Sequence, residues 1–283
     1  MSTGLAEITT FNGMPAIYLR TPDGSEATVL LHGAHVVSWK PGGGEERLYL
    51  SEKAIFEEGK AVRGGIPVIF PQFSNRGPLP GHGFARNLSW QHMSSRAMDD
   101  TAIAVFQLTD SEITRAIWPH AFNAEISVAI SNARLDVELA IENTGKQAMS
   151  FTAALHTYLR VAEVEEIELE GLHGQRYYDN VKGIEKIDSG VMLSIDREVD
   201  RIYFASTKPL LLRERRRALG IHGENMPDVV VWNPWKNRDP KFSDMPDSGF
   251  RRMLCVEAAV IDKPVCLSPQ ASWWGRQTLV ALG

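Results

Sequence analysis

The stretch from Ala124 to Ile141, AEISVAISNARLDVELAI, alternates apolar and polar residues on either side of Ser131-Asn132-Ala133. In an extended chain successive side chains point to opposite faces, so the alternation gives each half one apolar face. The β-branched residues of both halves favour strands, and the segment between them has the composition of a tight connection. The stretch therefore predicts an antiparallel hairpin with one face in a hydrophobic core.

Similar short segments recur through the rest of the chain at a spacing of roughly ten residues. They are residues 16–19, 27–31, 36–39, 68–70, 101–108, 149–161, 166–170, 191–195, 201–204, 210–213, 229–232, 253–260 and 277–282. The best short helix runs from Ser111 to Ile117, before Pro119. Many short strands without intervening helices predict an all-β fold, a large antiparallel β-sandwich with few short helices. The chain has no evident linker or repeat, so residues 1–283 are expected to form a single domain.

Composition and charge narrow the class of partner. The chain has 283 residues and a net charge of −5, which gives no basic surface suited to nucleic acid. It has no apolar run near the roughly 20 residues needed to span a bilayer, and MSTGLAEITTFNG lacks the features of a signal peptide. Cys255 and Cys266 cannot form a disulfide framework. We expect a cytoplasmic monomer or weak dimer that binds a small molecule, and neither nucleic acid nor membrane.

Residues 61–86, AVRGGIPVIFPQFSNRGPLPGHGFAR, have the composition of a folded loop around one brief strand. Glycine permits positive φ and proline fixes φ, so the flanking glycine and proline residues are typical of turns. Arg63 and Arg86 lie at the two ends, and His82 lies between them. A compact loop could bring the two guanidinium groups together around a phosphate or carboxylate. The alternative is two surface arginines that bond to backbone carbonyls.

Two titratable residues lie inside strand-like segments. Glu257 is the only charged residue of MLCVEAAV, where an unpaired carboxylate would be costly and burial would raise its pKa toward the range of a general base. Its alternative is an edge strand that leaves Glu257 in solvent. His156, in SFTAALHTYLRV, can give or take a proton near neutrality, although a strand histidine is also common as a structural residue.

Other polar residues are more ambiguous. Asp200 lies at the start of a strand segment, where it could bind a ligand or cap local amides. Trp232 and Trp235 could stack on a sugar, or pack in the core or at its rim. The basic run Arg213–Arg217 favours a solvated strand end or turn over an anion site. The acidic alternation of Glu163–Glu170 favours an exposed strand face.

Several motifs occur in a fixed order along the chain. They are LHGAHVVSWKP (31–41), VRGGIPVIFPQF (62–73), HGFAR (82–86), TAALHTYLRV (152–161), DREVDRIY (196–203), VVVWNPW (229–235), MLCVEAA (253–259) and SPQASWWGRQTL (268–279). Together they resemble the hexose-6-phosphate mutarotase (glucose-6-phosphate 1-epimerase) branch of the aldose 1-epimerase family. The resemblance covers roughly residues 25 to 280. It implies a galactose-mutarotase-like β-sandwich with a sugar groove across one face.

The resemblance also implies roles for individual residues. It makes His156 the catalytic acid and Glu257 the catalytic base. It assigns substrate binding to Arg63, His82, Arg86 and Asp200. The residue before His82 is Gly81, where some relatives carry a glutamine that contacts ligand, so one such hydrogen bond is in doubt.

The implied activity is interconversion of the α and β anomers of a hexose 6-phosphate, most simply glucose 6-phosphate. An acid and a base open and close the ring, and the reaction requires no metal or organic cofactor. Two alternatives are an aldose 1-epimerase for unphosphorylated sugar and a non-catalytic carbohydrate-binding protein. A binding protein would have no need of a matched acid and base.

Overall fold

The computed structural model describes residues 4–236 and 239–282. The strands are β1 (Leu5–Phe11), β2 (Met14–Arg20), β3 (Glu26–Leu30), β4 (His35–Lys40), β5 (Val68–Ile69), β6 (Gln91–Met98), β7 (Thr101–Thr109), β8 (Phe122–Ser131), β9 (Arg134–Asn143), β10 (Met149–Leu155), β11 (Tyr158–Arg160), β12 (Glu168–Glu170), β13 (Arg176–Asp179), β14 (Ile184–Ile187), β15 (Met192–Leu193), β16 (Val199–Tyr203), β17 (Leu210–Arg213), β18 (Ala218–Glu224), β19 (Asp228–Asn233), β20 (Met253–Leu267) and β21 (Ser272–Leu282). The helical elements are α1 (Glu112–Ile117) and the short 3₁₀ turns η1 (Ala85–Asn87), η2 (Val164–Glu166), η3 (Pro240–Phe242) and η4 (Gly249–Arg252).

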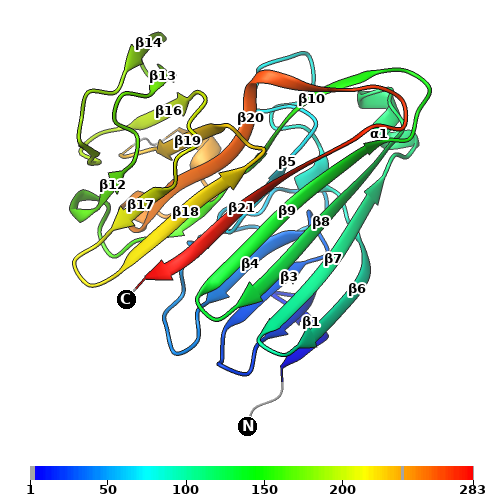
Figure 1. Cartoon of the computed structure of the whole chain (residues 1–283), viewed down its shortest axis with the longest axis horizontal. Helices are drawn as coiled ribbons and strands as arrows, with labels where there is room; N and C mark the ends of the chain where they lie inside the picture. The colour runs from blue at the N-terminus through cyan, green and yellow to red at the C-terminus, as the bar shows by residue number, and fades with distance from the viewer. Residues whose placement is uncertain (1–3, 237–238, 283) are drawn as a thin grey trace.

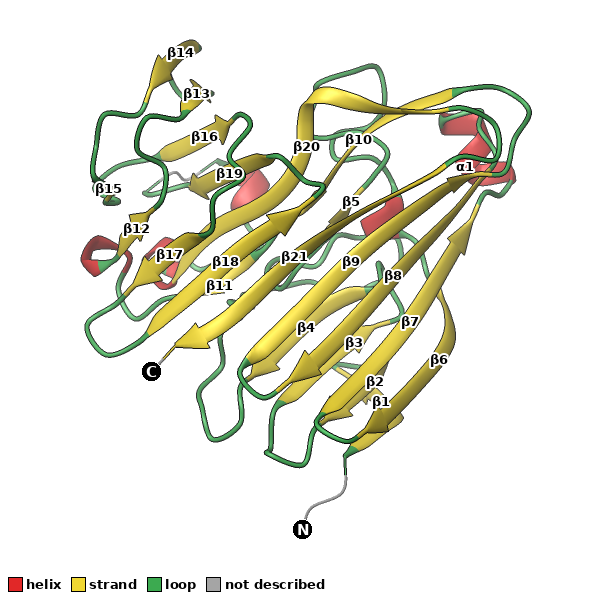
Figure 2. Cartoon of the chain, in the orientation of Figure 1, coloured by secondary structure: helices red, strands yellow, loops and turns green. Residues whose placement is uncertain are grey.

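The strands form three sheets. One has the order β1-β2-β3-β4, and the largest runs β15-β12-β17-β18-β21-β9-β8-β7-β6. The third runs β14-β13-β16-β19-β20-β10-β5, with β11 paired to β20 beside this path. Neighbouring strands are antiparallel. Figure 1 shows β6 to β9 and β21 in one layer with β1 to β4 behind them, and Figure 2 shows how little of the chain is helical. The predicted all-β antiparallel sandwich is confirmed.

Alternation of apolar and polar residues accounts for the core. In β8 and β9 every second side chain is buried, and the two strands pair in register from Phe122 opposite Asn143 to Ser131 opposite Arg134. The predicted hairpin is therefore confirmed. The main core cluster contains buried residues from all three sheets, from Ile17 in β2 to Leu279 in β21. The expectation of one domain agrees with this shared core and stays a prediction.

The predicted helix is confirmed, and its start follows from its sequence. Ser111 is the N-cap of α1, and its hydroxyl accepts a hydrogen bond from the Thr114 N–H while the Thr114 hydroxyl accepts one from the Ser111 N–H. These reciprocal bonds satisfy amides that a helix start leaves without partners. None of the helices in the described residues is both long enough and apolar enough to cross a membrane.

The strand predicted for residues 149–161 is wrong in one respect, because the chain leaves the sheet between β10 and β11. Some strands were also missed, among them β1, β6, β14 and β18. All four side chains of β14 are exposed, and β1 and β6 are mostly exposed or half-buried. β18 contains Gly220 and Gly223. Strands that bury little surface need no alternation of apolar and polar residues, so the sequence does not mark them as strands.

The basic run Arg213–Arg217 forms the turn from β17 to β18, as expected. Arg213 forms an ion pair with Glu170, and Arg215 forms one with Glu166. Both acidic partners belong to the acidic segment Glu163–Glu170, whose strand prediction holds only for β12, because residues 164–166 form the 3₁₀ turn η2. The two charged segments therefore neutralise each other at the surface.

Candidate active site

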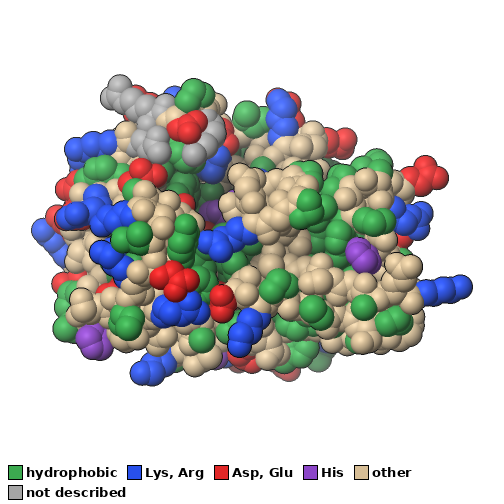
Figure 3. All heavy atoms as spheres, turned by 90° about the horizontal axis from the view of Figure 1, so that it is seen from above, with side chains coloured by type: hydrophobic (Ala, Val, Ile, Leu, Met, Phe, Trp, Pro, Cys, Tyr) green, Lys and Arg blue, Asp and Glu red, His purple; other side chains and the backbone are tan. Residues whose placement is uncertain are grey.

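All six residues selected from the sequence line one cavity of about 440 Å³. They are Arg63, His82, Arg86, His156, Asp200 and Glu257. Sites for small molecules usually measure about 300–1,000 Å³, so the cavity suits a molecule of the size of a monosaccharide. Figure 3 shows a hollow in one face with a histidine inside it and Lys or Arg side chains at its rim, which agrees with these lining residues.

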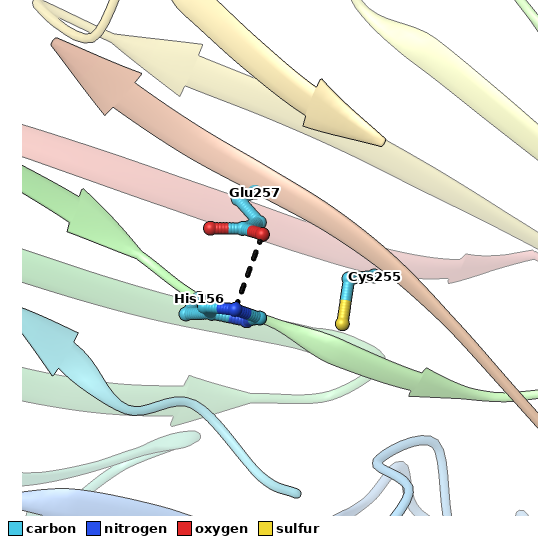
Figure 4. A group of neighbouring side chains, drawn as sticks. All are labelled: His156, Cys255 and Glu257. Atoms are coloured by element: carbon cyan, nitrogen blue, oxygen red, sulfur yellow. Dashed lines mark ion pairs between the residues drawn. The ribbon is translucent and has the colours of Figure 1, made fainter. Parts of the chain in front are cut away.

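Two neighbouring strands bring His156 and Glu257 together. Glu257 lies in the first third of β20, and β10 pairs with β20 until Leu155 lies opposite Ala258. The next residue, His156, donates its backbone N–H to the carbonyl of Pro67 at 3.0 Å and not to β20. The predicted placement of His156 within a continuous strand is therefore corrected. The imidazole occupies the break in the sheet, beside the carboxyl group of Glu257 (Figure 4).

The His156–Glu257 pair is close and almost completely buried. Nε2 of His156 lies 3.4 Å from Oε1 of Glu257, and the two side chains are 10% and 1% exposed. Burial, followed by the charge of Asp200, raises the pKa of Glu257 well above its ordinary value. Burial, followed by the neighbouring His82, lowers the pKa of His156 well below its ordinary value. The contact would be an ion pair if both groups were charged, but these shifts favour an uncharged pair that shares one proton.

The pair also keeps hydrogen-bonding capacity toward a ligand. Oε2 of Glu257 and Nδ1 of His156 are buried and make no hydrogen bond with the described residues. A buried polar atom without a partner costs about 1–3 kcal/mol. Such atoms at the base of a cavity are suited to a ligand that supplies the missing donor or acceptor.

The two arginines face the cavity with different partners. Arg63 donates from Nε to Oδ1 of Asp244 at 3.0 Å and from Nη1 to the hydroxyl of Tyr158 at 3.1 Å. The carboxylate of Asp244 therefore balances the charge of Arg63, so Arg63 does not require the shared anion that we expected between the two guanidinium groups. Arg86 has a long contact of 3.5 Å to the carbonyl of Gly81, and its Nε has no hydrogen-bond partner in the described residues.

Arg86 is consequently the less neutralised of the two cations. Burial lowers its pKa, and the nearby charge of Arg63 lowers it further. Burial and then the charge of Arg86 also lower the pKa of His82 to about 3, so this imidazole is neutral. An anion that enters the cavity would meet a positive field with Arg86 as its most available donor.

Asp200 lines the same cavity from β16. Its Oδ1 accepts a hydrogen bond of 2.6 Å from Nδ2 of Asn180, a cavity residue that sequence reasoning missed. Burial raises the pKa of Asp200, and the bond from Asn180 opposes this effect. Asn180 follows β13 in a turn, where asparagine is common for conformational reasons, so its position carried no functional signal.

Aromatic side chains hold the histidine and close one side of the cavity. The ring of Tyr158 stacks on His156 with centroids 4.8 Å apart and planes inclined by 12°. Trp232 meets both rings edge-on at 6.0 Å. Trp235 packs on Phe250 and does not line this cavity, so only one of the two candidate tryptophans is at the site.

The side chain of Asn75 lies directly beside Gly81. A Cβ atom at position 81 would lie 2.6 Å from Oδ1 of Asn75, and Asn75 lines the cavity. The asparagine therefore takes the space that a side chain at position 81 would need.

Comparisons with known proteins agree with this architecture. A family model described as aldose 1-epimerase matches residues 15–279. A protein of Cenchrus ciliaris, provisionally named glucose-6-phosphate 1-epimerase, is 36% identical over 286 residues, which cover 97% of this chain and 87% of that protein. A protein of Escherichia coli K12 with the same provisional name is 35% identical over 240 residues, which cover 83% of this chain and 79% of that protein.

A solved structure is also closely similar. It is the crystal structure of a protein from Salmonella typhimurium that is provisionally named a mutarotase. The two chains superpose with a TM-score of 0.90 at 29% identity, over 98% of this chain and 93% of the other.

Proposed function

The chain belongs to the aldose 1-epimerase family, and from this premise we propose that it interconverts the α and β anomers of a hexose 6-phosphate, with glucose 6-phosphate as the expected substrate. The observation that carries the proposal is the His156–Glu257 contact of 3.4 Å inside a cavity that also contains Arg86. An acid, a base and a cation in one small cavity are the groups that this reaction needs.

Ring opening requires two proton transfers at atoms bonded to the same carbon. Glu257 removes the proton of the C1 hydroxyl as the bond from C1 to the ring oxygen breaks. His156 donates a proton to that ring oxygen, and C1 becomes an aldehyde. Rotation about C1–C2 presents the other face of the carbonyl, and the same two transfers in reverse close the ring. Each positioned acid or base typically contributes about 10²–10⁴-fold to the rate.

Throughout this cycle the side chains of His156 and Glu257 together hold one titratable proton. With the ring closed, the reactive form is a carboxylate beside an imidazolium. With the ring open, it is a carboxylic acid beside a neutral imidazole, which is the form that burial favours. Loss or gain of a proton by the pair stops the cycle, so the rate should fall at both pH extremes.

The other cavity residues orient the substrate. Arg86, assisted by Arg63, would hold the phosphate, which is largely dianionic at neutral pH. Asp200 and Asn180 would bond to sugar hydroxyls, and Trp232 would cover an apolar face of the ring. Energy from these remote contacts serves to place C1 between Glu257 and His156.

The test compares anomer exchange of glucose 6-phosphate, glucose and galactose in saturation-transfer NMR. The proposal predicts strong acceleration with glucose 6-phosphate and little with either free sugar. Equal acceleration of the free sugars would instead identify an aldose 1-epimerase without phosphate preference. If the protein accelerates anomer exchange of none of the three sugars, it is not a mutarotase, and a carbohydrate-binding protein is favoured.

A further inference from the structure

A third side chain with metal-binding chemistry lies beside the acid–base pair. The ligand atoms of His156, Cys255 and Glu257 all lie within 4.8 Å of one another, and all three residues are buried. Cys255 and Glu257 are two residues apart on β20, so their side chains point to the same face of the strand. Figure 4 shows all three on one side of β20, with the imidazole opposite the two other groups.

The spacing approaches that of a tetrahedral zinc site. Zinc binds nitrogen, oxygen and sulfur ligands at about 2.0–2.3 Å, which places neighbouring ligand atoms about 3.3–3.7 Å apart. The separation of 3.4 Å between His156 and Glu257 already lies in that range. Since no two of the ligand atoms are more than 4.8 Å apart, a movement of about 1 Å by the Cys255 sulfur would complete a three-ligand face.

We propose that this cluster binds a soft divalent cation, with Zn²⁺ as the representative ion, and that the ion inhibits the protein by occupying its acid and its base. A thiolate, an imidazole and a carboxylate together favour Zn²⁺ over Mg²⁺ or Ca²⁺, which prefer sets of oxygen ligands. The fourth position of the ion would face the cavity. The inhibition rests on the proposed function, whereas the binding of the ion does not.

The charges of the bound state balance. The thiol of Cys255 and the shared His156–Glu257 pair each release one proton. The ion then faces one thiolate, one carboxylate and one neutral imidazole, so the buried cluster stays neutral overall. A neutral assembly avoids the large cost of an unpaired charge in this apolar region.

Other features indicate an inhibitory ion and not a resident cofactor. Histidines of established metal sites usually donate their second ring N–H to an acceptor that fixes the ring, but Nδ1 of His156 has none in the described residues. Cys255 belongs to an apolar cluster with Tyr49, Tyr158, Met245 and Met253. Without an orienting partner the site should release the ion to a chelator.

The chain offers a matched control, because Cys266 is its only other cysteine and is exposed. The experiment titrates wild type, Cys255→Ala, Cys255→Ser and Cys266→Ser with Zn²⁺ and follows glucose 6-phosphate anomer exchange. In wild type and Cys266→Ser we expect inhibition that EDTA reverses and that Mg²⁺ does not reproduce. In both Cys255 variants half-inhibition should require at least about tenfold more Zn²⁺, because even a lost second-shell contact typically costs 10–100-fold in metal affinity.

A second readout does not depend on activity. Co²⁺ added to wild type should give a thiolate-to-cobalt absorption band that is lost in the Cys255 variants and kept in Cys266→Ser. Thermal unfolding of the Cys255 variants checks that they are folded. The same sensitivity to Zn²⁺ in folded Cys255 variants, or no thiolate band in wild type, would overturn the proposal. A thiolate band in a protein that accelerates no anomer exchange would refute the proposed function while supporting the metal site.

Discussion

The proposed role of Glu257 as a base conflicts with its effect on the stability of the fold. Burial raises its pKa well above the ordinary value, so the folded protein binds this proton more tightly than the unfolded chain does. The stability contributed by protonated Glu257 is fully present below the ordinary carboxyl pKa of 4.5 and is lost as pH rises through the raised pKa. The carboxylate form that Glu257 needs in its proposed role as a base is therefore the form that the fold disfavours.

Glu257→Gln should remove this cost together with the activity. We expect a higher Tm than wild type at neutral pH, by about 2–4 °C for each 1 kcal/mol gained, and no difference near pH 4. Mutarotation should be lost at every pH. Thermal unfolding of both proteins across this pH range checks the expectation, and a Tm difference that does not change with pH would show that Glu257 is not a strained buried carboxyl.

Substitution of Arg86 should affect only the phosphorylated substrate, whereas substitution of Arg63 should affect both substrates. Arg86→Ala should lower kcat/KM for glucose 6-phosphate about 10–100-fold, because a hydrogen bond to a charged group contributes about 1.5–3 kcal/mol. Residual activity on glucose should hardly change. Arg63→Ala should impair both substrates, because Arg63 holds Tyr158, whose ring stacks on His156.

Steady-state kinetics of both variants on both substrates provide the measurement. Arg115→Ala, at an exposed arginine of helix α1, is the control and should behave as wild type. If Arg86→Ala lowers kcat/KM equally for both substrates, Arg86 does not bind the phosphate.

Strand β21 supports the break between β10 and β11. Gln277 of β21 is buried and donates from Nε2 to the carbonyl of Val256 at 3.0 Å, while its Oε1 accepts a hydrogen bond from the hydroxyl of Thr157. Thr157 and Val256 directly adjoin the two proposed catalytic residues, and the Val256 N–H donates to the Thr157 carbonyl at 3.1 Å. Gln277 thus links the two sheets behind the site, and we expect it to position His156 and Glu257.

Gln277→Leu should cost about 1–3 kcal/mol of stability, because it leaves buried polar groups without a partner. It should lower kcat more than it raises KM and move the pH–rate profile, because the His156–Glu257 spacing would relax. Thr278→Val changes the next residue of β21, whose hydroxyl bonds to Asp136 away from the site, and should keep the wild-type profile. A Gln277→Leu enzyme that is less stable but kinetically normal would refute the positioning role.

The strands could be predicted from the sequence wherever burial of one face imposes an alternation of apolar and polar residues. Residues 124–141 alternate because one face of β8 and β9 is buried, and Glu257 stood out because its strand has no other charge. The break at His156 could not be predicted, because it depends on Pro67, a distant residue that accepts its N–H. The pairing of Arg63 with Asp244 likewise joins residues 181 positions apart, and no local pattern records such a contact.

The core shared by the three sheets predicts cooperative unfolding of the chain. Buried residues of all three sheets belong to the main cluster, and smaller clusters lie beside it. We expect tryptophan fluorescence and far-UV circular dichroism to give one coincident transition in denaturant. Two separated transitions would divide the chain into independent domains.

The proposed acid and base can be tested by following α/β exchange of glucose 6-phosphate in saturation-transfer NMR with wild type, His156→Gln and Glu257→Gln. Wild type should accelerate the exchange far above the spontaneous rate. Each variant, shown to be folded by its thermal transition, should lose about 10²–10⁴-fold of that acceleration. Wild-type rates in either folded variant would contradict the assignment of His156 and Glu257 as the acid and base that interconvert the anomers.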